Sequence, residues 1–176
     1  MKKLFSEIPC IESEDIVLKK IELKHISALR ELVNDNKAYR YLPTFLYEKS
    51  SDDLVQVIGG LYTECFRQSI ILGIFRNDEF CGIAEMYGYR EEVGKISVGY
   101  RLISRYWGQG IATKTLGMMI GYLLNETDID IITASTMVEN TASARVLEKN
   151  GFIKVSSGYK EDWGYEEEVA VDKWVL

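Results

Sequence analysis

The stretch RYWGQGIATKT, residues 105–115, decides how the chain is read, because it joins a β-rich segment to a helical one through two closely spaced glycines. Gly108 and Gly110 carry no side chain just where Ile111 begins a predicted helix. The first amide N–H groups of a helix lack intrahelical partners, and the helix dipole places partial positive charge there. The turn therefore suits either a bound phosphate or a tight backbone turn without a ligand.

Two other phosphate-binding motifs do not match this turn. A P-loop has a glycine directly before its lysine, but the lysine that follows Gly108 is Lys114, and Thr113 precedes it. A dinucleotide fingerprint needs a third glycine where Thr113 stands, and it follows the first strand of a doubly wound unit. Nucleotide hydrolysis and hydride transfer are therefore disfavoured.

Before the turn, hydrophobic spacing predicts strands and helices that end in an antiparallel meander. The expected elements are a strand at 15–22, a helix at 25–35, a helix at 50–68 and three strands within 69–103. The candidate caps of the second helix are Ser50, Ser51 and Asp52. Breaks at Asn77-Asp78 and at 90–94 are short, so the three strands should pair antiparallel.

After the turn, the pattern changes to a helix at 110–126, a strand at 129–137 and a short helix at 140–152. A strand, a helical crossover and a strand imply one parallel pairing. Residues 152–163 and 166–176 read as closing strands, the second with three valines (169, 171 and 175) alternating against Ala170, Asp172 and Trp174. We expect one α/β domain over 1–176, with a mixed sheet, an antiparallel N-terminal half, a parallel step at the central strands, and helices on both faces.

The composition is that of one folded domain, with 47% apolar residues among 176. Twenty-one basic against 27 acidic residues give a net charge of −6, which disfavours nucleic acid as a partner. Three distant cysteines, Cys10, Cys65 and Cys81, form no CxxC pair and favour a reduced, cytoplasmic setting.

A single histidine, His25, excludes Ser-His-Asp chemistry and multi-histidine metal sites, so we expect no metal. It stands at a predicted helix start and is expected to be solvated. The N-terminus reaches Glu7 before any apolar core forms, which argues against a signal peptide. The longest apolar run, 116–124, is too short to cross a membrane.

The segment RYWGQGIA is similar to the R/Q-x-x-G-x-G/A signature of the GNAT superfamily of N-acetyltransferases. IESEDIVLKKIE (11–22), VGYRLISRYWGQGIATKTL (98–116) and VENTASARVLEKNGF (138–152) resemble its branch of ribosomal-protein alanine N-acetyltransferases. The resemblance covers most of the chain and implies acetyl-coenzyme A as cosubstrate, with the diphosphate on the backbone amides of the turn. The cofactor-binding residues it implies are Leu102, Ile103, Arg105, Trp107, Gly108, Gln109, Gly110, Ile111, Ala112, Thr113, Asn140 and Ser143.

The segment NTASARVLEKNGF has the pattern of a capped helix. Asn140 fits an N-cap, and Asn150-Gly151 fits a left-handed stop. The cap does not account for Ser143, and in the resembling family the matching asparagine and serine face the pantetheine arm and the sulfur. We therefore take Asn140 and Ser143 as candidate catalytic residues, with Ser143 protonating the departing thiolate.

The general base is less clear in the sequence. Many relatives carry a glutamate on the strand before the glycine turn, where this chain has Ser97. Glu85 is the best remaining carboxylate, and it would act directly or through water; the alternative is a polar position of an alternating strand. Tyr87 and Tyr100 line the same expected cleft or simply pack. The resemblance places the oxyanion donor, a backbone N–H, near Leu102, where residues 97–103 would bend away from the next strand and Gly99 would ease the bend.

The resemblance implies transfer of acetyl to a primary amine by direct attack in a ternary complex. The leading acceptor is a protein or peptide N-terminal α-amine, because its lower pKa leaves more of it neutral than a lysine amine. A small amine, such as a polyamine, an aminoglycoside or an amino-acid-like metabolite, is the enzyme alternative. A coenzyme A sensor without catalysis is the alternative of another class. A monomer and a homodimer both remain open.

Three further features have two readings each. Trp107 either covers the phosphate turn or, the favoured reading, fills the core beneath it. Residues 166–168 form a solvated acidic turn or attract a cationic substrate. Substrate specificity is expected in the first two helices and in the loops at 41–45 and 159–168.

Overall fold

The computed structural model describes Leu4 and residues 7–62 and 69–176. Eight strands in this part of the chain form one sheet in the order β1-β2-β3-β4-β5-β6-β8-β7. Their bounds are β1 Ile11–Glu12, β2 Ile16–Lys19, β3 Ser69–Arg76, β4 Glu79–Arg90, β5 Lys95–Leu102, β6 Ile131–Met137, β7 Ile153–Glu161 and β8 Val169–Val175. β5 pairs with β6 in parallel, and the other neighbouring pairs are antiparallel, which confirms the expected mixed sheet.

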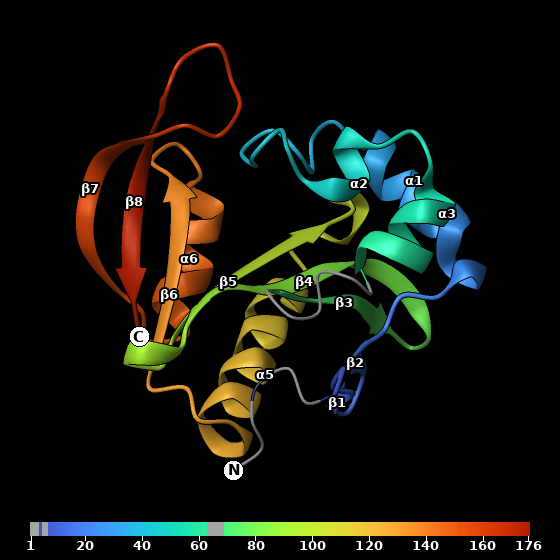
Figure 1. The fold of residues 1–176 in the computed structure, drawn as a ribbon, viewed down its shortest axis with the longest axis horizontal. Coiled ribbons are helices and arrows are strands. Elements are labelled where there is room, and N and C mark those ends of the chain that lie inside the picture. The colour runs from blue at the N-terminus through green and yellow to red at the C-terminus, as the bar shows by residue number, and fades with distance from the viewer. Residues whose placement is uncertain (1–3, 5–6, 63–68) are drawn as a thin grey trace.

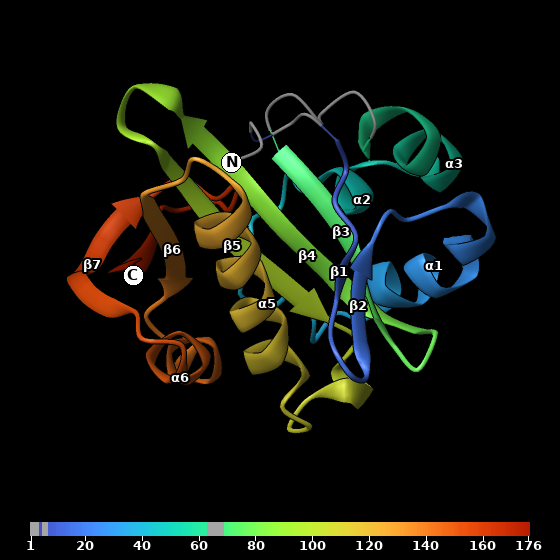
Figure 2. The same ribbon diagram turned by 90° about the horizontal axis from the view of Figure 1, so that it is seen from below.

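Helices cover both faces of this sheet (Figure 1). α1 (Ile26–Asn34), α2 (Tyr47–Ser50) and α3 (Leu54–Gln56) lie on one face, and α5 (Ile111–Glu126) lies on the other, as Figure 2 shows from below. α6 (Thr141–Lys149) packs beside α5. The sheet is thus buried between two helical layers, which is why its central strands are apolar on both faces.

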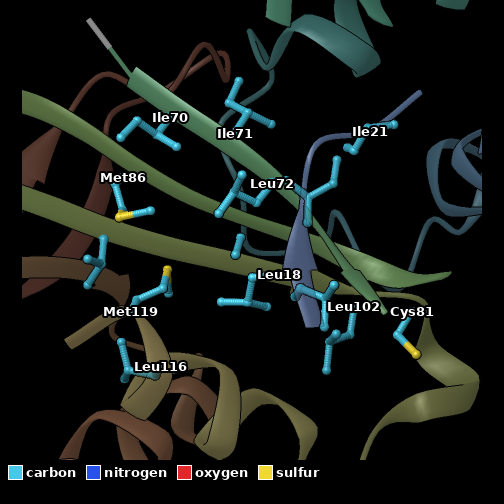
Figure 3. Packing of buried hydrophobic residues seen from close by; sticks show 14 of the residues in the cluster. Leu18, Ile21, Ile70, Ile71, Leu72, Cys81, Met86, Leu102, Leu116 and Met119 are labelled. Atoms are coloured by element: carbon cyan, nitrogen blue, oxygen red, sulfur yellow. The ribbon is translucent and has the colours of Figure 1, made fainter. Parts of the chain in front are cut away.

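The core lies between the central strands and α5. Leu72 and Met86 of the sheet and Leu116 and Met119 of α5 are all fully buried, and Figure 3 shows them around the same interior. Burying a side chain of this size contributes about 1.5–3 kcal/mol. This packing fixes the start of α5 against the sheet, and therefore fixes the glycine turn that precedes it.

Tight turns produce the antiparallel meander. Asn77 and Asp78 have φ of 49° and 64°, so both adopt the left-handed conformation of a two-residue hairpin turn between β3 and β4. Gly94, with φ of 57°, ends the turn between β4 and β5. The three-strand prediction for 69–103 is confirmed.

Three local expectations differ from the structure. The short strand β1 pairs with β2 and was not expected. The expected helix at 50–68 is instead the separate α2, α3 and a π-helical turn at Val57–Leu61, and its residues 63–68 lie outside the described part. Its cap is Asp53, whose carboxylate accepts from the amides of Val55 and Gln56, because Asp53 alone stands directly before the helical turn.

The expected last strand is confirmed as β8, and residues of both alternating sets are buried. Trp174 and Asp172 are buried along with Val171 in β8. Side chains of β7 cover part of this strand, because Lys154 pairs with Asp172 and lies over the Trp174 ring. The Trp174 indole N–H donates to Thr136 Oγ1 at 3.0 Å, which satisfies the buried polar group.

Candidate functional site

A cavity of about 600 Å³ opens where β5 and β6 separate. The two strands pair only from Lys95 to Ser97 against Ile131 to Thr133. Beyond that point Val98–Leu102 and Ala134–Thr136 form facing walls of the cavity, and Figure 1 shows the strands diverging. The parallel step thus frees the backbone edge of β5 for an extended ligand.

The glycine turn forms one end of this cavity. Gly108 and Ala112 line it, and α5 begins at Ile111 with no side chain capping its first amides. Gly108 and Gly110 have φ of 73° and 78°, which explains a glycine at each position. A Cβ added at either glycine would meet nothing within 4 Å. The glycines therefore leave open space beside unpaired helix amides, which is the arrangement that an anion needs.

Seven of the predicted site residues line the cavity: Glu85, Leu102, Trp107, Gly108, Ala112, Asn140 and Ser143. Gly110, Ile111 and Thr113 do not line the cavity themselves. They belong to the same turn and first helical residues as Gly108 and Ala112, which do. Ile103 is buried, and its amide N–H donates to the Cys81 carbonyl at 2.9 Å. The Ile103 amide is therefore already satisfied within the protein.

The side chains of Arg105 and Gln109 are exposed, bond to other protein groups, and do not line the cavity. Arg105 pairs with Glu31 and stacks on the ring of Tyr106. Gln109 accepts from Arg76 Nη1 at 2.8 Å and donates to the Arg105 carbonyl at 3.0 Å. Both side chains shape the turn from outside, so a contribution to cofactor binding would come from their backbone.

The favoured reading of Trp107 is wrong. Its side chain is 50% exposed and lies on the cavity wall, while Tyr106 and Ile111 fill the core. The Trp107 indole N–H donates to the Leu102 carbonyl at 3.0 Å. Because this bond ties the ring to the end of β5, Trp107 forms a fixed edge of the cavity next to Gly108.

Asn140 and Ser143 meet the cavity at the start of α6. The Asn140 side chain caps the helix by accepting from the Ser143 amide at 3.2 Å. The Ser143 hydroxyl shares a hydrogen bond of 3.0 Å with the Tyr100 hydroxyl of β5. Burial raises the pKa of Tyr100 to about 12, so its phenol stays protonated at neutral pH. Because one hydroxyl donates to the other, the pair leaves one O–H free to donate at this point of the cavity.

Glu85 lies on the opposite wall, on β4. Its side chain is 14% exposed, and Oε2 accepts from Arg101 Nη1 at 3.0 Å. In the part of the chain that the structure describes, no hydrogen bond or ion pair to the other oxygen, Oε1, is found. Ser97, in the position of the family glutamate, shares a hydrogen bond with Thr133 at 2.9 Å. Glu85 is therefore a carboxylate with one oxygen fixed and one available.

Sequence reasoning did not anticipate several parts of the cavity. Glu161 lines it, with one oxygen paired to Lys173 and the other accepting from the Trp163 indole at 2.9 Å. The Thr44 amide donates to the Trp163 carbonyl at 2.9 Å, and the Tyr165 hydroxyl donates to the Leu42 carbonyl at 2.7 Å. The two loops in which specificity was expected thus contact each other across 119 or more positions of sequence. No local pattern signals such contacts.

Neither His25 nor the acidic residues 166–168 line the main cavity. His25 is half-buried against Phe75, with ring centroids 4.7 Å apart, and its Nδ1 accepts from the Glu22 amide, so the solvated reading is wrong. Burial lowers its pKa. The acidic residues 166–168 are exposed, as the solvated reading expects.

The described residues contain neither a membrane-spanning helix nor a metal-binding cluster. No helix there is long and apolar enough to cross a membrane. No group of three or more His, Cys, Asp or Glu side chains there has an arrangement that could hold a metal ion.

Comparisons with known proteins agree with this architecture. Residues 15–153 match the family model described as acetyltransferase (GNAT) domain. The chain is 26% identical over 144 residues to the uncharacterized N-acetyltransferase p20 of Bacillus licheniformis, covering 81% of each chain. It is 25% identical over 147 residues to the ribosomal-protein-serine acetyltransferase of Escherichia coli (strain K12), covering 80% of each.

A similar solved structure is that of RimL, described as ribosomal L7/L12 alpha-N-protein acetyltransferase in complex with coenzyme A. Its TM-score is 0.82 at 20% identity, with 96% of this chain and 97% of that chain covered. A likeness at this identity shows the fold. The family match over residues 15–153 shows that this chain belongs to the GNAT family of acetyltransferases.

Proposed function

We propose that the protein acetylates the N-terminal α-amine of a protein or peptide by direct attack in a ternary complex. The observation that carries this proposal is one cavity that starts at uncapped helix amides and holds Glu85 on one wall and the Ser143–Tyr100 pair on another. The relatives whose names specify a ribosomal-protein acceptor support the choice of acceptor.

The residues present fit the cosubstrate. The open space beside Gly108 and Gly110 accommodates a diphosphate on the first amides of α5, and the free edge of β5 accommodates a pantetheine arm. Leu102, at the end of that edge, would supply a backbone N–H for the oxyanion. Acetyl-coenzyme A supplies the acetyl group as a thioester.

The side chains then handle two protons. Glu85 takes a proton from the acceptor amine through its available oxygen, directly or through water. Ser143 gives a proton to the leaving sulfur, and the Tyr100 hydroxyl keeps Ser143 oriented and re-protonates it. Tyr100 then takes a proton from solvent, and Glu85 releases to solvent the proton that it took from the amine. At neutral pH an α-amine with a pKa near 8 is already about one-tenth neutral, whereas a lysine amine is neutral in only about one molecule in 2,500. An α-amine therefore requires less deprotonation by the proposed base than a lysine amine does.

A matched set of acceptors tests the proposal. One peptide carries a free α-amine and acetylated lysines, and a second, of the same sequence, carries an acetylated N-terminus and free lysines. Spermidine and an aminoglycoside complete the set. We expect mass spectrometry to find acetyl on the first peptide. Faster turnover of a small amine would favour the metabolite alternative, and acetyl-coenzyme A binding without any turnover would favour the sensor.

The hydroxyl pair gives a separate prediction. Ser143→Ala should lower kcat roughly 100-fold, because the leaving thiolate loses its proton donor, while the affinity for acetyl-coenzyme A changes little. Tyr100→Phe should have a smaller effect, since Ser143 keeps its own hydroxyl. Steady-state kinetics with the α-amine peptide measures both. Ser157→Ala removes a hydroxyl that lies on β7 against Asp172 and serves as the control. An unchanged kcat in Ser143→Ala would exclude Ser143 as the donor.

A further inference from the structure

A buried ionic cluster connects helix α2 to Glu85. Glu48 of α2 is fully buried, and its Oε1 lies 2.6 Å from Arg101 Nε. The Arg101 side chain is only 3% exposed, and its Nη1 reaches Glu85 at 3.0 Å. The hydroxyls of Tyr39 and Tyr62 donate to the two Glu48 oxygens at 3.0 and 3.1 Å. One guanidinium thus holds two carboxylates from different elements.

The electrostatics of the cluster keep its groups charged. Burial acts to raise the pKa of Glu48, but the Arg101 charge and the hydrogen bonds to the carboxylate together leave that pKa below its usual range. Burial acts to lower the pKa of Arg101, and the two carboxylates outweigh it in turn. Removing charges from water is expensive, and a well-packed apolar replacement is often as stable. Stability alone is therefore a weak reason for this cluster.

The position of Glu85 suggests another reason. Glu85 lies on the wall between the main cavity and a second cavity of about 350 Å³, and it lines both. Glu48 lines only the second cavity and is covered by its tyrosine partners. Glu48 therefore does not touch a reacting group in the main cavity, although it is two contacts away from the proposed base.

We propose that Glu48 is a positioning residue for acetyl transfer: through Arg101 it commits one oxygen of Glu85 and leaves the other oriented toward the acceptor amine. This inference rests on the proposed function, in which Glu85 takes the proton. It also makes the packing of α2, residues Tyr47–Ser50, part of the catalytic geometry. A base held by one fixed contact keeps its place within the tolerance that proton transfer requires.

The charges facing Glu85 predict opposite effects for two variants. Arg101 on β5 is its cation, Glu48 on α2 is the like charge on the other side of Arg101, and Tyr87 and Glu161 line the same cavity as Glu85. In Glu48→Gln a like charge disappears, so the acid limb of kcat against pH should move to lower pH. In the double variant Glu48→Gln/Arg101→Met the cation disappears as well, so the limb should move to higher pH.

The same variants should change rate rather than cofactor binding. Glu48→Gln should lower kcat about tenfold and leave acetyl-coenzyme A affinity unchanged, because Arg101 loses its ion pair with Glu48 and then holds Glu85 less firmly. The double variant removes both buried charges together, which avoids leaving either one unpaired and so keeps the test open if the single variant does not fold. Thermal unfolding and calorimetric acetyl-coenzyme A binding establish that each variant is folded.

Asp172→Asn is the matched control, because Asp172 is a buried carboxylate with its own ion pair to Lys154 at 2.6 Å and no contact with the cluster. It should lose stability and keep the wild-type pH profile. If Glu85→Gln is inactive but both Glu48 variants keep the wild-type acid limb and kcat, the positioning role is overturned while the proposed function stands. If the wild-type protein acetylates no amine, the proposed function itself has failed.

Discussion

Gly110→Val is expected to abolish measurable binding of acetyl-coenzyme A. Gly110 has φ of 78° directly before α5, and a Cβ there would project into open space rather than against protein atoms. A branched side chain would therefore occupy the space assigned to the diphosphate and would distort the amides of the first helical turn. Losing two charge-assisted hydrogen bonds of about 1.5–3 kcal/mol each lowers affinity at least roughly 100-fold. Isothermal titration calorimetry measures this directly.

A second glycine provides the control for backbone strain. Gly158 of β7 has φ of 71°, and a Cβ added there would also meet nothing within 4 Å. Gly158→Val therefore carries a similar conformational cost, about 1–2 kcal/mol, far from the turn. It should lower the melting temperature as Gly110→Val does, without changing cofactor affinity. Unchanged affinity in Gly110→Val would remove the assignment of the diphosphate to this turn.

Glu85→Gln is expected to lower kcat by about 100- to 10,000-fold, the usual effect of removing a general base. Glutamine is isosteric and keeps an oxygen that accepts from Arg101, so the fold and acetyl-coenzyme A binding should be retained. The sign of the pH effect follows from the role of Glu85. In the wild type, activity falls as pH decreases and the carboxylate becomes protonated, whereas the variant has no carboxylate there, so its acid limb should be flat. The profile of kcat at saturating peptide is the measurement.

Glu161 is the matched control for Glu85, because both carboxylates line the main cavity. The two oxygens of Glu161 are already engaged by Lys173 and by the Trp163 indole, whereas Glu85 keeps one oxygen available. Glu161→Gln should therefore retain the acid limb. If instead Glu161→Gln loses the limb and Glu85→Gln keeps it, the base is Glu161, and Glu85 has a structural role.

Much of the fold could be predicted because its signals are local. Gly108 and Gly110 require left-handed backbone, Asn77-Asp78 requires a tight hairpin turn, and Asn140 caps the helix that follows it. Each signal depends on residues a few positions apart. The alternation of apolar residues added the element order, and the crossover from β5 through α5 to β6 implied the parallel step. The region of the cofactor site could therefore be predicted from short stretches of sequence.

The exposure of two tryptophans, Trp107 and Trp174, could not be predicted from the sequence. Trp107 is apolar and stands next to a turn, so its type alone favours burial, yet its ring forms the cavity edge through one bond to Leu102. Trp174 is fully buried, with its indole N–H bonded to Thr136 of β6 and its ring under Lys154 of β7. In both cases the partners that a large side chain meets in the fold decide its exposure, and its residue type alone does not.

The sequence by itself determined the elements from 69 to 176, the glycine turn and the Asn140 cap, because backbone conformation and periodicity depend on neighbouring residues. Only the tertiary structure decided which side chains meet. Glu48, Glu85 and Arg101 belong to α2, β4 and β5, and they contact one another only after α2 packs on the sheet. The physical reason is that a charge pair is defined by distance and by exclusion of water, and neither quantity is set until the elements are assembled.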